Sequence, residues 1–279
     1  MIPLEALALI AQHQNAVTSR FKDWATVGYS DIESANIVGY TTKVAEAGKF
    51  IILGAQFELV AGGTEVNGLI SGVDAVAFDN TGAFKKTAAQ VQIPNALGAY
   101  TTLYYLEDGW FDDGSEEGDY KPGWCDGDGN IADTELTPGV AIWAKSVADS
   151  SINVAGAVPG SDSAQISCPE IFALRANTFP SSIIVNSEKM TSQDIVPVAF
   201  DDKGAFKKTA PQLQIPNALG AYTTLYYLED GWFDDGSEEG DYKAGWCDGD
   251  GNITDTEIPA AQGFWTKGVS GAFTLTFKK

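Results

Sequence analysis

Residues 82–135 read GAFKKTAAQVQIPNALGAYTTLYYLEDGWFDDGSEEGDYKPGWCDGDGNIADTE, and this stretch returns almost unchanged at residues 204–257. The two copies align without a gap at an offset of 122 residues, and only four of the 54 positions differ. The similarity continues more weakly on both sides, where Trp143 aligns with Trp265. Similarity at one fixed offset is the signature of a repeated structural unit. The sequence therefore predicts two copies of a whole domain of about 110 residues.

Each copy reads as a series of short strands. Residues 51–53, 99–106 and 140–145 are rich in β-branched and aromatic side chains, which is typical of strands. The second copy ends in residues 272–277, whose alternation of apolar and polar side chains is that of a half-buried strand. Clusters of glycine, aspartate and asparagine separate the runs, and no helical stripe of any length appears inside either copy. The predicted fold is all-β, with two tandem antiparallel β-sandwich or barrel-like domains.

An amphipathic segment precedes the first copy. Apolar residues recur at helical spacing with polar residues between them, which predicts one helix that ends near residues 23–26. This helix is expected either to pack on its own β domain or to dock on a neighbouring subunit. The predicted organisation is an N-terminal helix and linker over 1–34, a first β domain over 35–157 and a second over 158–279. The residues of the expected assembly interface are Leu4, Leu7, Ile10, Val17, Phe21 and Trp24.

Composition and charge exclude several classes of function. The chain has 279 residues, 44% of them apolar, and a formal net charge of −21. A field of that sign repels nucleic acid and anionic lipid, and no stretch approaches the roughly 18 apolar residues of a membrane span. His13, the single histidine, lies outside the repeats, so a Ser–His–Asp or Cys–His catalytic site would have to be built around the N-terminal segment. We therefore expect a protein that is not an enzyme.

The negative charge is concentrated in one segment of each copy. Residues 107–135 hold eleven carboxylates and one lysine, and residues 229–257 repeat that count. The two segments thus account for 20 of the 21 net negative charges, and the rest of the chain is nearly neutral. Carboxylates at this density repel one another unless something neutralises them. A bound hard cation such as calcium is the natural candidate.

The best local metal motif is DGDGNIADTE at residues 126–135. Its alternating carboxylates, turn glycine, isoleucine and terminal glutamate resemble the core of an EF-hand calcium loop. In that register Trp124 takes the place of the first aspartate, and the flanks read as strands or loops, so a true EF-hand is not expected. A calcium loop of another geometry and a solvated acidic loop that binds nothing remain the two alternatives. The candidate ligands are Asp126, Asp128, Asn130, Asp133 and Glu135, with Asp248, Asp250, Asn252, Asp255 and Glu257 in the second copy.

Aromatic residues and cysteines accompany the acidic segment. Trp110, Phe111 and Trp124 stand beside acids, as in surfaces on which sugars stack, although we favour packing in the β-sandwich core. Cys125 and Cys247 occupy equivalent positions in the two copies. Equivalent positions should lie a domain apart, too far for a disulfide. Buried free thiols are the favoured state, with an intersubunit disulfide as the alternative.

Short motifs carry a family resemblance. They are SANIVGY at 34–40, GKFI at 48–51, the Gly-Trp pair at 123–124 and GFWTK at 263–267. Together they resemble the repeat modules of uncharacterised secreted proteins in verrucomicrobial and lentisphaeral bacteria. The resemblance covers most of the chain after the N-terminal segment, and it implies an exported location but no activity. Glu5 after a short apolar start also resembles the mature N-terminus of type IV pilins, although polar residues interrupt the apolar stretch here.

These observations favour a structural role. The leading hypothesis is a non-enzymatic subunit of an extracellular or cell-surface assembly (a filament, sheath or surface layer) that associates with copies of itself and whose acidic loops bind calcium. One alternative is a carbohydrate- or surface-binding module that uses the acidic and aromatic segment. Another is a virion decoration protein, because no secretory leader can be read at the start of the chain.

Overall fold

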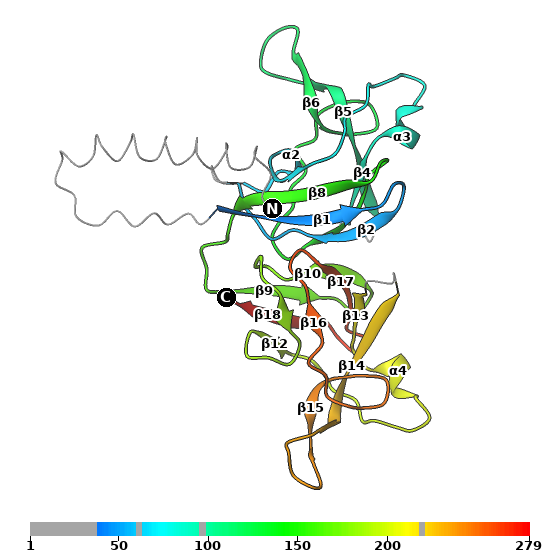
Figure 1. Cartoon of the computed structure of the whole chain (residues 1–279), viewed down its shortest axis with the longest axis vertical. Helices are drawn as coiled ribbons and strands as arrows, with labels where there is room; N and C mark the ends of the chain where they lie inside the picture. Colours follow the sequence, from blue (N-terminus) through cyan, green and yellow to red (C-terminus); the bar gives the residue numbers. More distant parts are fainter. Residues whose placement is uncertain (1–37, 60–62, 95–98, 218–220) are drawn as a thin grey trace, which may run out of the picture. The chain divides into compact units, whose positions relative to one another are not determined.

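A computed structural model describes residues 38–59, 63–94, 99–217 and 221–279. The described residues belong to one compact unit. They are mostly strand, and every pair of neighbouring strands in the sheets is antiparallel (Figure 1), so the all-β prediction is confirmed. The expected N-terminal helix and its interface lie outside the described residues: Leu4, Leu7, Ile10, Val17, Phe21 and Trp24.

The first repeat is a sandwich of two sheets. The larger sheet has the strand order β2-β7-β4-β5-β6, and the smaller has the order β1-β8-β3. Apolar side chains from both sheets meet in one core, with Val91 and Leu103 facing Ile152 and Val154. The elements are β1 (Val38–Ala45), β2 (Phe50–Gly54), α2 (Val66–Leu69), β3 (Ile70–Ser71), α3 (Phe84–Thr87), β4 (Gln90–Pro94), β5 (Tyr100–Phe111), β6 (Asp119–Cys125), β7 (Ala141–Lys145) and β8 (Ser150–Ala157).

The second repeat has the same plan. Its larger sheet has the order β10-β17-β13-β14-β15, a three-stranded sheet has the order β12-β18-β9, and β11 pairs with β16. Phe273, Leu275 and Phe277 form the centre of its core. The elements are β9 (Ser163–Cys168), β10 (Ala173–Ala176), β11 (Ile183–Ile184), β12 (Met190–Gln193), α4 (Phe206–Thr209), β13 (Gln212–Pro216), β14 (Tyr222–Phe233), β15 (Asp241–Cys247), β16 (Glu257–Ile258), β17 (Gly263–Lys267) and β18 (Phe273–Lys278).

The strands agree with the sequence pattern. The run at 51–53 lies in β2, the run at 99–106 falls largely in β5, the run at 140–145 falls largely in β7, and the alternating run at 272–277 falls largely in β18. The expected boundary between the β domains falls in the connection from β8 to β9. The helices α2, α3 and α4 are single turns of four residues. No helix of the described chain has the length and apolar character needed to cross a bilayer.

The two repeats contact each other through equivalent residues. Leu53 forms a β-bridge with Gln262, and Val140 forms one with Arg175. Residue 175 is the repeat equivalent of 53, and residue 262 is the equivalent of 140. Exchanging the two repeats therefore turns one contact into the other. Reciprocal contacts of this kind define an isologous interface, as found between the subunits of twofold dimers. Here the two halves of that interface are covalently joined.

A small apolar cluster fills this interface. It consists of Ile52 and Ala141 from the first repeat and Leu174 and Ala176 from the second, and all four side chains are buried. Gly263 lies against it so closely that an added Cβ would stand 2.4 Å from Ile52 Cγ2 and 2.5 Å from Ala141 Cβ. A side chain at position 263 would force the repeats apart, since atoms packed at interior density cannot yield that far.

Gln56 is the polar centre of the interface. Its side chain is fully buried. Its amide nitrogen donates to the carbonyls of Phe179 at 2.8 Å and Asn177 at 3.2 Å, and its amide oxygen accepts from the N–H of Ala261 at 2.8 Å. One side chain of the first repeat therefore satisfies three backbone groups of the second. Buried polar groups need such partners, so the hydrogen bonds of Gln56 stabilise the contact between the repeats.

Candidate functional site

The acidic loop after β6 is closed by its own first carboxylate. Asp126 Oδ1 accepts from the N–H of Asp128 at 2.9 Å and of Asn130 at 3.0 Å, and Oδ2 accepts from the Asn130 amide at 3.1 Å. Partial burial raises the pKa of Asp126, but the hydrogen bonds from Asn130 and the backbone outweigh it, so the pKa lies below its ordinary value. Asp126 thus serves as a structural anion that holds the turn.

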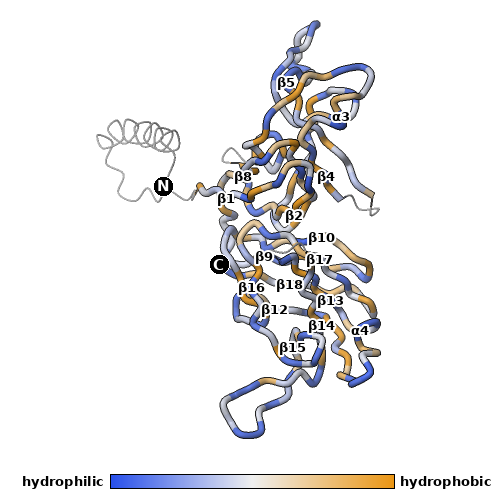
Figure 2. Tube along the Cα trace, turned by 45° about the vertical axis from the view of Figure 1, so that its right-hand side comes forward, coloured by the Kyte–Doolittle hydropathy of each residue, from blue (hydrophilic) through white to orange (hydrophobic). Residues whose placement is uncertain are grey.

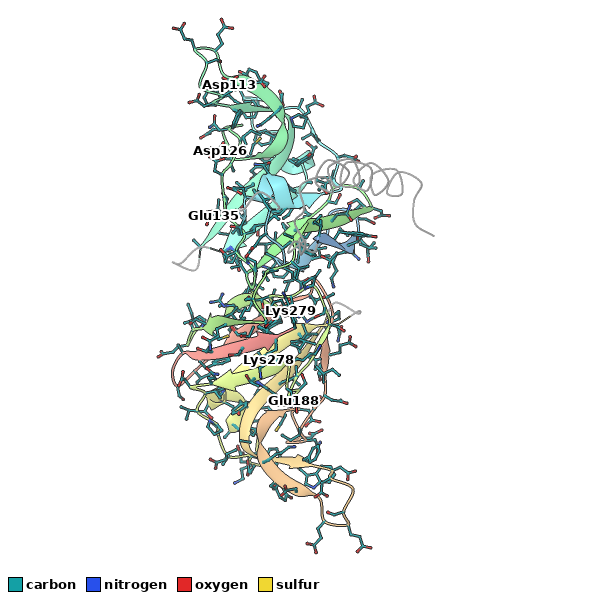
Figure 3. The ribbon with its side chains drawn as sticks, turned by 90° about the vertical axis from the view of Figure 1, so that its left-hand side faces the viewer. Asp113, Asp126, Glu135, Glu188, Lys278 and Lys279 are labelled. Atoms are coloured by element: carbon teal, nitrogen blue, oxygen red, sulfur yellow. The ribbon has the colours of Figure 1, made fainter. Side chains whose placement is uncertain are left out.

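The remaining predicted ligands of the first copy do not join this turn. Glu135 lies on a segment that bridges to Glu65. Figure 3 labels Asp113, Asp126 and Glu135 at separate levels of the first repeat, without a common point toward which they converge. Residues 126, 128 and 130 are therefore brought together, whereas Asp133 and Glu135 follow them along the next extended segment.

The second copy repeats this arrangement. Asp248 accepts from the N–H groups of Asp250 and Asn252, both at 2.9 Å, and Glu257 pairs with Ile184 in a different strand pair. Asp255 lies between the turn and that strand. Within the described ranges, no group of three or more His, Cys, Asp or Glu side chains is arranged to hold a metal ion. Calcium binding stays a prediction.

Two long hairpin arms carry most of the other acids of segments 107–135 and 229–257. We define the first arm as residues 109–121 at the end of β5 and β6, and the second arm as residues 231–243 at the end of β14 and β15. Each arm begins after a register shift, between Leu106 and Gly109 in the first copy. Figure 2 shows the loops at the ends of both hairpins as hydrophilic, in contrast to the strands of the sheets.

The acids of the first arm lie at its tip. Asp112 accepts from the N–H of Gly114 at 3.0 Å, and Asp113 accepts from the N–H of Ser115 at 2.9 Å. Hydrogen bonds from the Ser115 hydroxyl and backbone lower the pKa of Asp113. These turns present the side chains of Glu116 and Glu117 to solvent. The arm therefore offers unpaired carboxylates at its end.

Aromatic side chains line the stem of each arm. Trp110 pairs across the strands with Tyr120, and these residues are 37% and 66% exposed. The interpretation of Trp110 as a core residue was wrong, because Trp110 lies on the arm, beyond the register shift, where its side chain is exposed. For Trp124, only 1% exposed, the core interpretation is confirmed. Phe111 is half-buried beneath the Lys121 ammonium, which lies 3.4 Å from the centre of its ring.

A second aromatic surface crosses the junction of the repeats, and we call it the seam. It is a row of four rings in the order Phe50, Trp143, Trp265 and Phe172, with neighbouring ring centres 6.3 Å apart. The second half of the row is the repeat equivalent of the first. The planes of neighbouring rings are inclined by 58° to 86°. These edge-on contacts make a ridge and not the flat platform that stacks a sugar ring.

The seam carries two lysines, and no carboxylate stands at the described strand positions beside them on its face of the sheets. Lys145 lies 5.4 Å from the ring centre of Phe50, and Lys267 lies 5.2 Å from that of Phe172. The strand positions that share this sheet face with Trp143 and Trp265 are aromatic, aliphatic, amide or hydroxyl residues, and no carboxylate stands among them: Ile52, Gln90, Gln92, Thr102, Tyr104, Leu174, Gln212, Gln214, Thr224 and Tyr226.

Cys125, Cys168 and Cys247 are buried free thiols, which agrees with the prediction made for Cys125 and Cys247. Burial raises the pKa of Cys125 to about 11, with further contributions from nearby aspartates, and it raises the pKa of Cys168 to about 11 and of Cys247 to about 12. A thiol is reactive only as thiolate, so these groups act as small core residues.

The described surface is thus divided between acidic arms and a cationic aromatic seam. Each repeat contributes one arm and one half of the seam, so a partner that binds one arm has a second, equivalent binding position on the same chain. Comparisons with protein-family models, curated proteins and solved structures find no match to this chain.

Proposed function

We propose that the chain is a non-enzymatic structural subunit of an extracellular assembly such as a filament, sheath or surface layer. The observation that carries this proposal is the segregation of its charges. Across the described ranges the structure has a single ion pair, between Lys49 and Glu46. Among the described residues, the acids on the arms and the lysines on the seam form no ion pair. Charges arranged this way are matched between molecules, where complementary surfaces steer association.

Exposed apolar strand residues support the same proposal. The strand β1 is the edge of its sheet, and Val38, Tyr40 and Val44 on it are 55%, 66% and 74% exposed. Soluble monomers usually protect an edge with charge, proline or a covering segment. An apolar edge instead suits a subunit whose neighbours cover it.

Electron microscopy and light scattering of the purified full-length chain test the proposal. We expect ordered polymers or sheets whose formation is weakened by high salt, because salt screens charge between molecules. Particles that stay monomeric over a wide range of protein concentration and salt would contradict it.

A carbohydrate-binding module is the second candidate, and one observation favours it. Trp110 and Tyr120 on the first arm, with their equivalents Trp232 and Tyr242 on the second, are exposed beside carboxylates. Aromatic faces and acids together suit sugar rings and their hydroxyl groups. Dispersed monomers that bind a glycan array would favour this function over assembly.

We also propose that calcium binds the loops at 126–135 and 248–257. At 10 mM calcium, a site with a dissociation constant near 1 mM adds about 1.4 kcal/mol to the free energy of unfolding. We expect a higher melting midpoint with calcium than with chelator, and no equal effect of sodium chloride at matched ionic strength. The double variant Asp128→Asn and Asp250→Asn should lose this shift while its calcium-free midpoint is kept, because Asp126 and Asp248 still close the turns. An unchanged midpoint in the unmodified protein would remove the metal from the proposal.

A further inference from the structure

We infer that the acidic arm of one copy docks on the cationic aromatic seam of a second copy. The inference rests on the proposed self-assembly and names the two surfaces that would make it. The occupant of the seam is thus another molecule of this chain, bound through residues 109–121 or their equivalents at 231–243.

Charge complementarity is the first argument. The tip of each arm, residues 112–119 or 234–241, carries five carboxylates and no base. The seam presents Lys145 and Lys267 on a face whose paired strand positions include no carboxylate. A surface of positive charge on a chain of net charge −21 has its strongest attraction toward the most acidic part of another copy.

The shape beside the seam is the second argument. A hollow of about 540 Å³ lies next to Phe50 and is lined from both repeats, by Lys43, Glu46, Lys49 and Trp143 on one side and Pro216 and Tyr222 on the other. Glu46 pairs with Lys49, so Lys43 is the lysine of this hollow without an ion pair among the described residues. Partial burial lowers the pKa of Lys43, whose ammonium donates to Gln262 at 2.8 Å. An aromatic side chain such as Tyr120 fits a hollow of this volume, and its carboxylate neighbours would meet Lys43 in the hollow and Lys145 on the seam.

Apolar contact is the third argument. Phe50 and Phe172 at the ends of the seam are 40% and 42% exposed, and Tyr120 and Tyr242 on the arms are 66% exposed. Aromatic side chains that become buried at the centre of an interface contribute most of its binding energy. The arm and the seam therefore offer matched aromatic content as well as opposite charge.

Sheet order places the arm and the Phe50 end of the seam on opposite edges. The strand β2, which carries Phe50, is one edge of the five-stranded sheet, and β6 is the opposite edge. Four strand spacings of about 4.8 Å separate these edges by about 19 Å. Because arm and seam are different surfaces, their contact is heterologous, and a heterologous contact that does not close on itself extends into a polymer.

The test is a charge exchange in the full-length chain. The seam variant is Lys145→Glu with Lys267→Glu, and the arm variant reverses the glutamate pairs of both tips by Glu116→Lys, Glu117→Lys, Glu238→Lys and Glu239→Lys. Each variant alone should raise the concentration needed for half-maximal assembly by about tenfold or more, as expected when close charges become repulsive. Mixing the two variants should restore assembly, because each then carries the complement of the other. Light scattering and electron microscopy give the readout.

The matched control is Lys189→Glu with Lys278→Glu, which changes the net charge by the same amount at exposed positions away from the seam. It should assemble like the unmodified chain. Assembly that is unaffected by seam or arm reversal would overturn the inference and leave the proposed function standing. Assembly that is lost instead with Leu7→Asp or Phe21→Asp, and is indifferent to charge reversal, would assign the contact to the N-terminal segment. Absence of assembly in the unmodified chain would overturn both proposals.

Discussion

Replacing Trp124 by alanine should lower the free energy of unfolding of the first repeat by about 3–5 kcal/mol, the range for deleting a large buried aromatic side chain. The indole is 1% exposed and packs on Tyr105 with ring centres 5.1 Å apart. Its Nε1 donates to the carbonyl of Ile70 at 3.1 Å. The variant loses the transfer free energy of the ring and leaves a cavity. It also leaves the buried carbonyl of Ile70 without its hydrogen-bond donor.

The equivalent change at Trp246 should act on the second repeat. Trp246 is 2% exposed, and its Nε1 donates to the Ser192 hydroxyl at 3.0 Å. Because Ser192 can turn to another partner more readily than a backbone carbonyl can, we expect Trp246→Ala to cost somewhat less than Trp124→Ala. The comparison isolates the contribution of the acceptor, since the two rings lie in equivalent surroundings.

Differential scanning calorimetry of the full-length chain measures both effects. A loss of about 3–5 kcal/mol in the free energy of unfolding should lower the thermal unfolding midpoint by about 10 °C, since 1 kcal/mol corresponds to about 2–4 °C in a chain of this size. The matched control is Tyr120→Ala on the arm, which removes an exposed ring and should change the free energy of unfolding by no more than about 0.5 kcal/mol. Equal destabilisation by Trp124→Ala and Tyr120→Ala would show that the assigned core is wrong.

The same pair of residues shows how far sequence reasoning reaches. Trp124 and Trp110 stand in similar acidic and aromatic surroundings, and the general preference of tryptophan for protein cores favours the core for both. The structure separates them by their positions along the hairpin: Trp124 pairs with Tyr105 within the sandwich, whereas Trp110 pairs with Tyr120 on the arm, beyond the register shift between Leu106 and Gly109. No residue type in the segment shows where the hairpin leaves the sandwich. The strands themselves were predictable, since β-branched and aromatic runs mark them.

The candidate sites were predictable only in part. The concentration of acids on one segment is visible in the sequence, but Glu135 pairs with Glu65, 70 residues earlier in the chain, so its distance from Asp126 depends on tertiary structure. The seam was missed for the same reason. Trp143 and Trp265 contact each other only because the two repeats meet face to face through equivalent residues. A partial signal existed: two tryptophans in the same position of two repeats meet when the repeats are related by a twofold axis that passes close to that position.

That twofold relation leads to the second large prediction, at Gln56. Gln56→Leu keeps the volume of the side chain but removes the partners of three backbone groups, those of Phe179, Asn177 and Ala261. A buried polar group without a partner costs roughly 1–3 kcal/mol, so we expect a loss of about 3 kcal/mol or more. The damage lies between the repeats, and the cooperative transition should therefore split into two in calorimetry or urea unfolding.

Thr178 supplies the matched control, because it is the repeat equivalent of Gln56 on the other side of the twofold relation. It is 2% exposed, and its hydroxyl has no hydrogen-bond partner among the described residues. Thr178→Val removes that unpaired oxygen without changing the shape, so stability should stay equal or rise by up to about 1 kcal/mol. If the free energy of unfolding falls with Gln56→Leu and rises with Thr178→Val, the interface depends on hydrogen bonds from one repeat only. If Gln56→Leu proved as harmless as Thr178→Val, the apolar cluster and the seam would hold the repeats together, and the hydrogen bonds of Gln56 would not contribute to the stability of their interface.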